Sequence, residues 1–174
     1  RERILDSGRN LPQITISSAS AGNAVMLGAG YFSPLPGFMN KKDALSVAET
    51  MHTEDGLFFP IPILNLCQKT IDIAVGQDLI LKDPNVKGNP PLAIQTVESI
   101  EELSLSEQTY LLERIFGTTD PKHPGVAAFI NQGNRLISGP IRVFNFSYFQ
   151  TEFPETFRTA YLIRDEIQRL GWEK

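Results

Sequence analysis

The stretch AGYFSPLPGFMN, residues 29–40, decides how the rest of this sequence is interpreted. It combines two glycines and two prolines with the apolar side chains of Phe32, Phe38 and Met39. Prolines and glycines at this density exclude a regular helix or a central strand, so we expect a loop. An irregular loop with so many apolar side chains is typical of a substrate site, a plug that packs into the core, or a surface for another domain.

Working outward from this loop, the periodicity of apolar residues predicts many short strands with helices placed irregularly between them. Asn40 is suited to cap a helix over 41–51, and Gly117 to end one over 107–116. Pro60 and Pro62 make the apolar segment 54–67 an edge strand or a bulged one. The other expected helices are 20–30, one ending near Gly133, and 154–170; the expected strands are 11–18, 77–83, 92–103, and a pair in 135–146 interrupted at Gly139–Pro140. This order predicts an α+β fold with a small, barrel-like mixed sheet.

Composition and charge exclude several classes of protein. The 174 residues include 16 basic and 20 acidic ones, and the net charge of −4 gives no electrostatic reason to expect a nucleic acid or an anionic membrane as partner. No run approaches the roughly 20 apolar residues that cross a bilayer. The single cysteine, Cys67, excludes an intramolecular disulfide and fits a cytoplasmic protein. Because the sequence starts at an arginine and ends in RLGWEK, we expect part of a longer polypeptide.

The motifs of the common enzyme classes are absent from the sequence. There is no P-loop, no dinucleotide-binding G-x-G-x-x-G after a strand, and no G-x-S-x-G nucleophile turn. His52 and His123 each stand alone, so we expect surface or capping roles for them. Adjacent carboxylates on a strand, such as Glu101 and Glu102, point to opposite faces. We therefore expect no catalytic, cofactor-binding or metal-binding residue in this chain.

The last predicted helix, 154–170, has a broad apolar stripe that includes Tyr161 and Ile167. Arg158 and Arg169 share its polar face with acidic residues, whereas Arg164 lies at the edge of the stripe, where it could meet another domain. The sequence therefore offers four candidates for core or interdomain contacts: Phe32, Phe38, Met39 and Arg164.

Three motifs in one order carry a resemblance to a known family. They are GYFSPLPGFMN (30–40), DGLFFPIPI (55–63) and DPKHPGV (120–126), and SGPIRVFNFSYFQ and FPETFRTAYLIRDEIQRLGW extend the match to the end of the chain. Together they resemble the N-terminal region of the ATP sulfurylases (sulfate adenylyltransferases). The variant AGNAVMLGAGYFSP is most similar to the enzymes of sulfur-oxidising bacteria.

The resemblance implies a PUA-like domain over residues 1–152, a small mixed β-barrel with peripheral helices. Residues 153–174 would be a linker and the first helix of an α/β nucleotidyltransferase domain that is otherwise absent. The family joins ATP and sulfate into adenosine 5′-phosphosulfate and pyrophosphate, or runs the reverse reaction, with Mg²⁺ carried by ATP. The implied partners are these substrates and products and the catalytic domain of the same chain, with a homo-oligomer when intact.

The family's catalytic signatures, a Gln-Thr-Arg-Asn-Pro stretch and a Gly-Arg-Asp-His segment, lie beyond the Gly-Trp pair that follows the final helix. This sequence stops two residues past Trp172, so none of those residues is carried over. We therefore expect a scaffold that is inactive alone.

Two other functions stay open at this point. The chain could be an independent RNA-binding module of PUA-like fold, or a stand-alone enzyme acting in the 29–40 loop. An RNA titration at low salt separates the first of these from a scaffold, because phosphate contacts make binding salt-sensitive.

Overall fold

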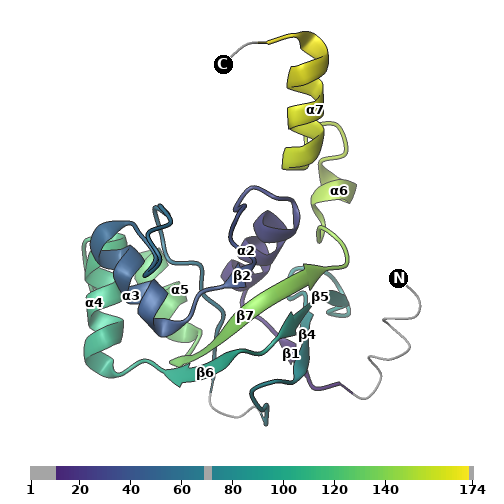
Figure 1. The fold of residues 1–174 in the computed structure, drawn as a ribbon. Coiled ribbons are helices and arrows are strands. Elements are labelled where there is room, and N and C mark those ends of the chain that lie inside the picture. The colour runs from purple at the N-terminus through teal and green to yellow at the C-terminus, as the bar shows by residue number, and fades with distance from the viewer. Residues whose placement is uncertain (1–10, 69–71, 173–174) are drawn as a thin grey trace.

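A computed structural model describes residues 11–68 and 72–172 of the protein. Its elements are β1 (Gln13–Thr15), α2 (Ser18–Gly28), β2 (Gly37–Phe38), α3 (Lys41–Thr50), β3 (Leu66–Cys67), β4 (Asp78–Lys82), β5 (Pro91–Thr96), β6 (Ser99–Glu102), α4 (Leu105–Phe116), α5 (Pro124–Asn131), β7 (Arg135–Val143), α6 (Phe149–Glu152) and α7 (Ala160–Leu170). In Figure 1, α3, α4 and α5 gather at one end of the sheet, whereas α6 and α7 project from the other.

The strands form one mixed sheet with the order β1-β4-β5-β7-β2. The β1–β4 pair is parallel, and the other pairs are antiparallel. This arrangement confirms the expected α+β class with a mixed sheet. Side chains such as Leu79, Leu81, Leu92 and Leu136 fill the core between the sheet and its helices, and none of these four is exposed.

Strand β7 is the longest strand and organises the sheet. One of its edges pairs with β5 and β6, and its other edge pairs with β2 and β3. We expected a strand pair interrupted at Gly139–Pro140, which is wrong, because the chain runs through both residues as one strand. Gly139 has a φ of +130°, and an added Cβ would lie 2.1 Å from the carbonyl oxygen of Thr96. Glycine therefore lets the strand continue where its neighbours come close.

The expected single strand 92–103 is likewise wrong. Two strands, β5 and β6, replace it and meet β7 one after the other. The break lies at Val97 and Glu98, and the Glu98 N–H donates to the Ser138 carbonyl at 3.0 Å. Residues 97 and 98 lie beside Gly139, where the two segments of the chain come close together. This close approach interrupts the strand, although the alternation of apolar residues over 92–103 appears continuous in the sequence.

Local signals predicted most helix ends correctly. The Asn40 side chain accepts the Asp43 N–H at 2.9 Å at the start of α3, and Gly117 ends α4 in a left-handed conformation. The last helix is an exception, because α7 begins at Ala160 and not near Pro154. Residues 154–156 form a turn, and Thr159 is the cap of α7, with its hydroxyl accepting the Leu162 N–H at 3.3 Å.

Candidate functional site

The 29–40 loop places two of its apolar side chains in the core. Phe38 is 3% exposed and Met39 is 2% exposed. The Met39 N–H donates to the Ile63 carbonyl at 2.9 Å, and the Ile63 N–H reaches the Met39 sulfur at 3.4 Å. Phe38 lies on β2 opposite Gly139 of β7. This half of the loop is therefore a plug that joins the loop to the central strand.

The first half of the loop makes two kinds of contact: Phe32 packs within the body of the domain, and residues 29–31 bond to the C-terminal part of the chain. Phe32 packs edge-to-face against Phe59, with ring centroids 5.5 Å apart. The Tyr31 hydroxyl donates to the Arg158 carbonyl at 2.7 Å, and the Ala160 N–H donates to the Ala29 carbonyl at 2.8 Å. We call residues 29–31 the bracket and residues 149–170 the arm. The bracket ties the start of α7 to the body of the domain.

A cluster of aromatic rings forms the second support of the arm, and our sequence analysis missed it. Phe146, Phe149 and Phe157 pack together, with ring centroids 5.3 Å apart for Phe146–Phe157 and 5.8 Å for Phe149–Phe157. Phe153 lies 6.4 Å from Phe149. The signal was present as phenylalanines at spacings of three and four residues over 146–157, the spacing of residues that share a helix face.

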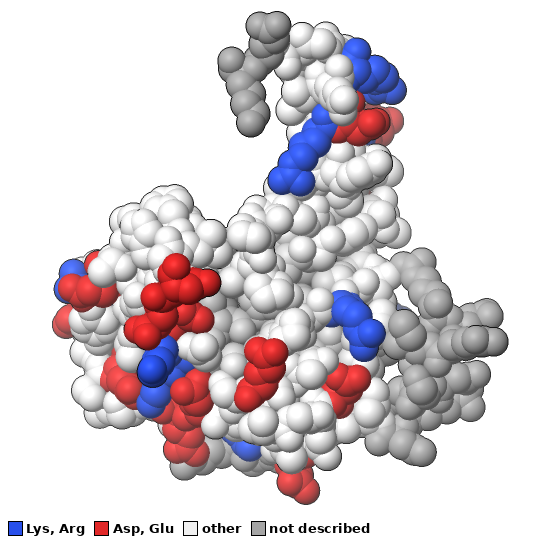
Figure 2. Space-filling view, viewed as in Figure 1, with Lys and Arg blue, Asp and Glu red and all other residues white. Residues whose placement is uncertain are grey.

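Helix α7 projects away from the body of the domain (Figure 1), and several of its apolar side chains are exposed. Tyr161 is 75% exposed, Leu170 is 52% exposed, and Leu162 and Ile167 are also exposed. Arg164 lies on the same helix and is exposed, and Figure 2 shows basic side chains on the arm. An amphipathic helix gains most of its stability from packing its apolar face, and these four apolar side chains stay exposed among the residues that the structure describes.

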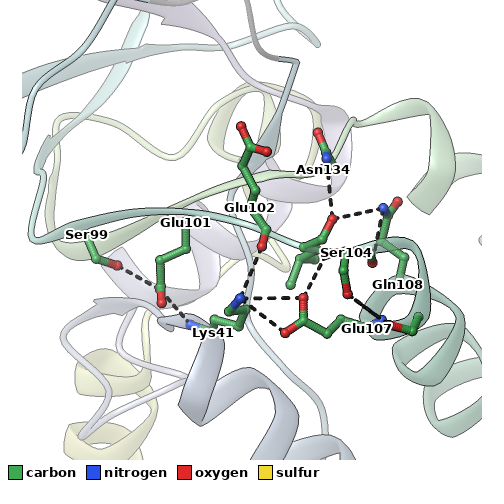
Figure 3. Close-up of polar contacts among 10 residues, drawn as sticks. Lys41, Ser99, Glu101, Glu102, Ser104, Glu107, Gln108 and Asn134 are labelled. Carbon is green, nitrogen blue, oxygen red and sulfur yellow. Dashed lines mark hydrogen bonds and ion pairs between the residues drawn. The ribbon is translucent and has the colours of Figure 1, made fainter.

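A polar cluster, shown in Figure 3, joins the starts of α3 and α4 to β6. The Lys41 N–H donates to Glu101 at 2.9 Å, and the Lys41 ammonium group lies 3.1 Å from Glu107. Glu107 also accepts the Ser104 N–H at 2.7 Å, while the Ser104 hydroxyl accepts the Glu107 N–H at 3.2 Å, which completes a capping box. The side chains of Glu101, Ser104 and Glu107 accept hydrogen bonds from backbone N–H groups at the starts of the two helices, so the cluster has a structural role.

The Ser104 N–H bond to the Glu107 carboxylate lowers the pKa of Glu107 below its ordinary value of 4.5, and Lys41 adds to the effect. A lowered pKa stabilises the fold above pH 4.5, and this contribution disappears as the pH falls through the pKa of the folded state. We expect Glu107→Gln to lower the free energy of unfolding at neutral pH by less than about 1 kcal/mol, because the ion pair is partly solvated. Urea unfolding across the acid range measures this. The deficit should vanish at low pH, and a deficit that stays constant on acidification would contradict the role of the carboxylate charge.

The two histidines and the cysteine have ordinary structural roles. His123 caps α5, where its Nδ1 accepts the Val126 N–H at 3.4 Å, and His52 packs against Phe58. Burial raises the pKa of the Cys67 thiol, with the Arg135 charge acting in the opposite direction. Among residues 11–68 and 72–172, no three His, Cys, Asp or Glu side chains gather in a way that could hold a metal ion.

An apolar pocket of about 300 Å³ lies between α2, α5 and residues 61–66. Its walls include Ile63, Phe116 and Phe129, and its polar side chains are the amides of Asn23 and Gln132. None of the described residues that line it has a titratable side chain. Within the part of the chain that the structure describes, no helix is long and apolar enough to cross a membrane.

Comparisons with known proteins agree with this description. The profile of a family described as "PUA-like domain" matches residues 1–146. A sulfate adenylyltransferase of Allochromatium vinosum is 55% identical over 172 residues, and one of Alcanivorax borkumensis is 51% identical over the same length. Each match covers 99% of this chain and 43% of the relative. A third, from the Riftia pachyptila sulfur-oxidizing endosymbiont, is 45% identical and is covered to 39%.

These matches confirm the resemblance to sulfate adenylyltransferases that the sequence motifs indicated. The chain spans 43% or less of the length of these relatives. Among solved structures, a chain titled "Hexameric APS kinase from Thiobacillus denitrificans" shares the fold, with a TM-score of 0.71 at 21% identity. That match covers 100% of this chain and 29% of the other.

Proposed function

Because this chain belongs to the family of PUA-like domains, we propose that it is the N-terminal domain of a sulfate adenylyltransferase. The observation that carries the proposal is the 55% identity to such an enzyme along 99% of this chain. The whole enzyme would join ATP and sulfate into adenosine 5′-phosphosulfate and pyrophosphate, or catalyse the reverse reaction. Mg²⁺ would enter with ATP as part of the substrate.

In this proposal the chain supplies support and not chemistry. Transfer of an adenylyl group develops charge that cationic groups must stabilise. On the face of the body drawn in Figure 2, the described residues show no such gathering of basic side chains. The exposed apolar face of α7 supports the other half of the proposal, because a catalytic domain of the same polypeptide would cover it. The interdomain role of Arg164 belongs to this proposal, as does a boundary near residue 152.

The RNA-binding alternative has less support. The matched relatives carry the name sulfate adenylyltransferase, and the net charge of −4 gives weak attraction to phosphates. The alternative of a stand-alone enzyme acting in the 29–40 loop also loses support, because Phe38 and Met39 are buried in the core.

The proposal has two further parts. We place the intact protein in the cytoplasm, and we propose that it forms a homo-oligomer.

The test is an assay for ATP formation from adenosine 5′-phosphosulfate and pyrophosphate. It compares the full-length protein that contains this sequence with the 174-residue chain alone. We expect turnover by the full-length protein and none above the blank by the chain, since the reaction needs clustered cationic groups and none is seen among the described residues on the face drawn in Figure 2. An inactive full-length protein that is folded by circular dichroism would contradict the proposed activity. Turnover by the purified chain would contradict the scaffold role.

A further inference from the structure

We propose that Tyr31 is a positioning residue that sets the direction in which α7 leaves the domain. Contacts between residues 29–31 and the start of α7 support this role. Its consequence for catalysis rests on the proposed function, because the orientation of α7 would fix the orientation of a catalytic domain packed on its apolar face.

The bracket holds α7 at two backbone groups on either side of its cap. The Tyr31 hydroxyl donates to the carbonyl of Arg158 at 2.7 Å, one residue before the cap Thr159. The N–H of Ala160, one residue after the cap, donates to the Ala29 carbonyl at 2.8 Å. A tilt of the helix about its first turn changes the length or the angle of these bonds. Hydrogen bonds weaken steeply with distance and angle, so this pair of bonds defines a direction.

The aromatic cluster defines the direction of α7 less precisely than the bracket does. Phe146, Phe149 and Phe157 hold the segment before α7 against the body through ring contacts 5.3–5.8 Å apart. Such contacts are attractive over a range of ring geometries, because burial of apolar area is not directional. The cluster therefore keeps the arm attached, while the bracket sets its angle.

The helix amplifies any error in this angle. Its 11 residues extend about 16 Å at 1.5 Å per residue, so a tilt of about 4° at the base moves the far end by about 1 Å. A misplacement of about 1 Å can lower the rate of an enzyme by about 100-fold. A contact at the base of α7 can therefore affect catalysis without touching a substrate.

Tyr31 can be changed without damage to the core. Its side chain is 44% exposed, and its bond to Arg158 lies at the surface. In Tyr31→Phe, water can satisfy the Arg158 carbonyl, and no cavity forms. The melting temperature should change by no more than about 4 °C, the effect of losing one solvent-exposed hydrogen bond. A merely structural role would affect the melting temperature, whereas a positioning role affects the direction of α7.

Spin labels on Lys87→Cys, in an exposed turn, and Gln168→Cys, on α7, measure this direction as a distribution of distances. The native Cys67 is buried, so it should stay unlabelled. We expect Tyr31→Phe to raise the population of other arm orientations roughly 2- to 10-fold, the effect of losing one hydrogen bond. The matched control is Tyr110→Phe on α4, which makes the same chemical change away from the arm and should leave the distribution unchanged.

A second variant removes the other bond of the bracket. Proline is tolerated at the first position of a helix, and Thr159 has the extended backbone that a following proline requires, with ψ at 157°. Ala160→Pro should therefore keep α7, remove the donor to Ala29 and place the ring Cδ against the Ala29 carbonyl, which pushes the two apart, and it should widen the distribution further in combination with Tyr31→Phe. If neither variant nor their combination widens the distribution, the proposal is wrong.

The catalytic consequence is tested in the full-length protein. Tyr31→Phe should lower kcat about 3- to 10-fold, with the KM for ATP and the melting temperature close to those of Tyr110→Phe. An unchanged kcat beside a widened distribution would overturn the link from α7 to catalysis while the wild-type activity still supports the proposed function. An inactive wild type would overturn the proposed function, and the spin-label result would still decide the positioning role.

Discussion

Replacing Phe38 with alanine is expected to lower the free energy of unfolding by roughly 3–5 kcal/mol. The ring is 3% exposed and belongs to the hydrophobic core. Its strand, β2, pairs with β7 opposite Gly139, where little room exists for the backbone to collapse. The loss therefore combines the transfer of the ring out of the core with the cost of a cavity that the surrounding strands cannot fill.

Urea or thermal unfolding of the variant measures this loss. The matched control is Phe58→Ala, because Phe58 is 60% exposed and should contribute less than about 1 kcal/mol. A loss of that small size for Phe38 would mean that the ring is accessible in solution, and the 29–40 loop would again be a candidate for binding. The two variants remove the same side chain, so the difference between them isolates burial.

Gly139→Ala is expected to lower the free energy of unfolding by about 2–5 kcal/mol. Two effects add at this position. The φ of +130° is strained for any residue with a Cβ, and the new Cβ would lie 2.1 Å from the Thr96 carbonyl oxygen and 3.0 Å from the Glu98 nitrogen. Both contacts are with backbone atoms of the β5–β6 junction, so a side-chain rotation cannot relieve them. The strands would have to separate at the centre of the sheet.

Gly56→Ala is the control that separates these two effects. Gly56 also has a positive φ, +89°, but an added Cβ there would meet nothing within 4 Å. It should show only the conformational cost, roughly 1–2 kcal/mol. Equal losses for Gly56→Ala and Gly139→Ala, measured by chemical unfolding, would show that the β5–β6 junction yields and that the close approach is not a constraint.

The sequence predicted those features that depend on a few neighbouring residues. Asn40 and Gly117 mark helix ends through bonds within their own turns, so the sequence contains the whole signal. Pro154 is a local signal for a helix start, but tertiary contacts override it and α7 begins later, at Ala160. Phe157 turns into the aromatic cluster, and Ala160 bonds to Ala29, more than one hundred residues earlier in the chain.

In the candidate site, too, the sequence predicted what depends on local residue types and not what depends on distant contacts. The residue types of the 29–40 loop were sufficient to suggest a plug, since buried apolar side chains follow from composition. Its second role as a bracket depends on the Tyr31 hydroxyl meeting a carbonyl 127 positions away, and no pattern in the sequence marks an acceptor on the backbone. The exposed face of α7 was visible as an apolar stripe, whereas the direction of the helix needed the structure.

The exposed end of the arm also gives the protein an optical probe of its own. Trp172 is the single tryptophan of the sequence, lies two residues beyond α7, and is 67% exposed. Indole emission shifts to shorter wavelength when the ring leaves water, so the fluorescence of the unmodified protein should change as soon as α7 is covered. In this chain, the emission maximum of Trp172 therefore reports whether the end of the arm lies in water, without any label.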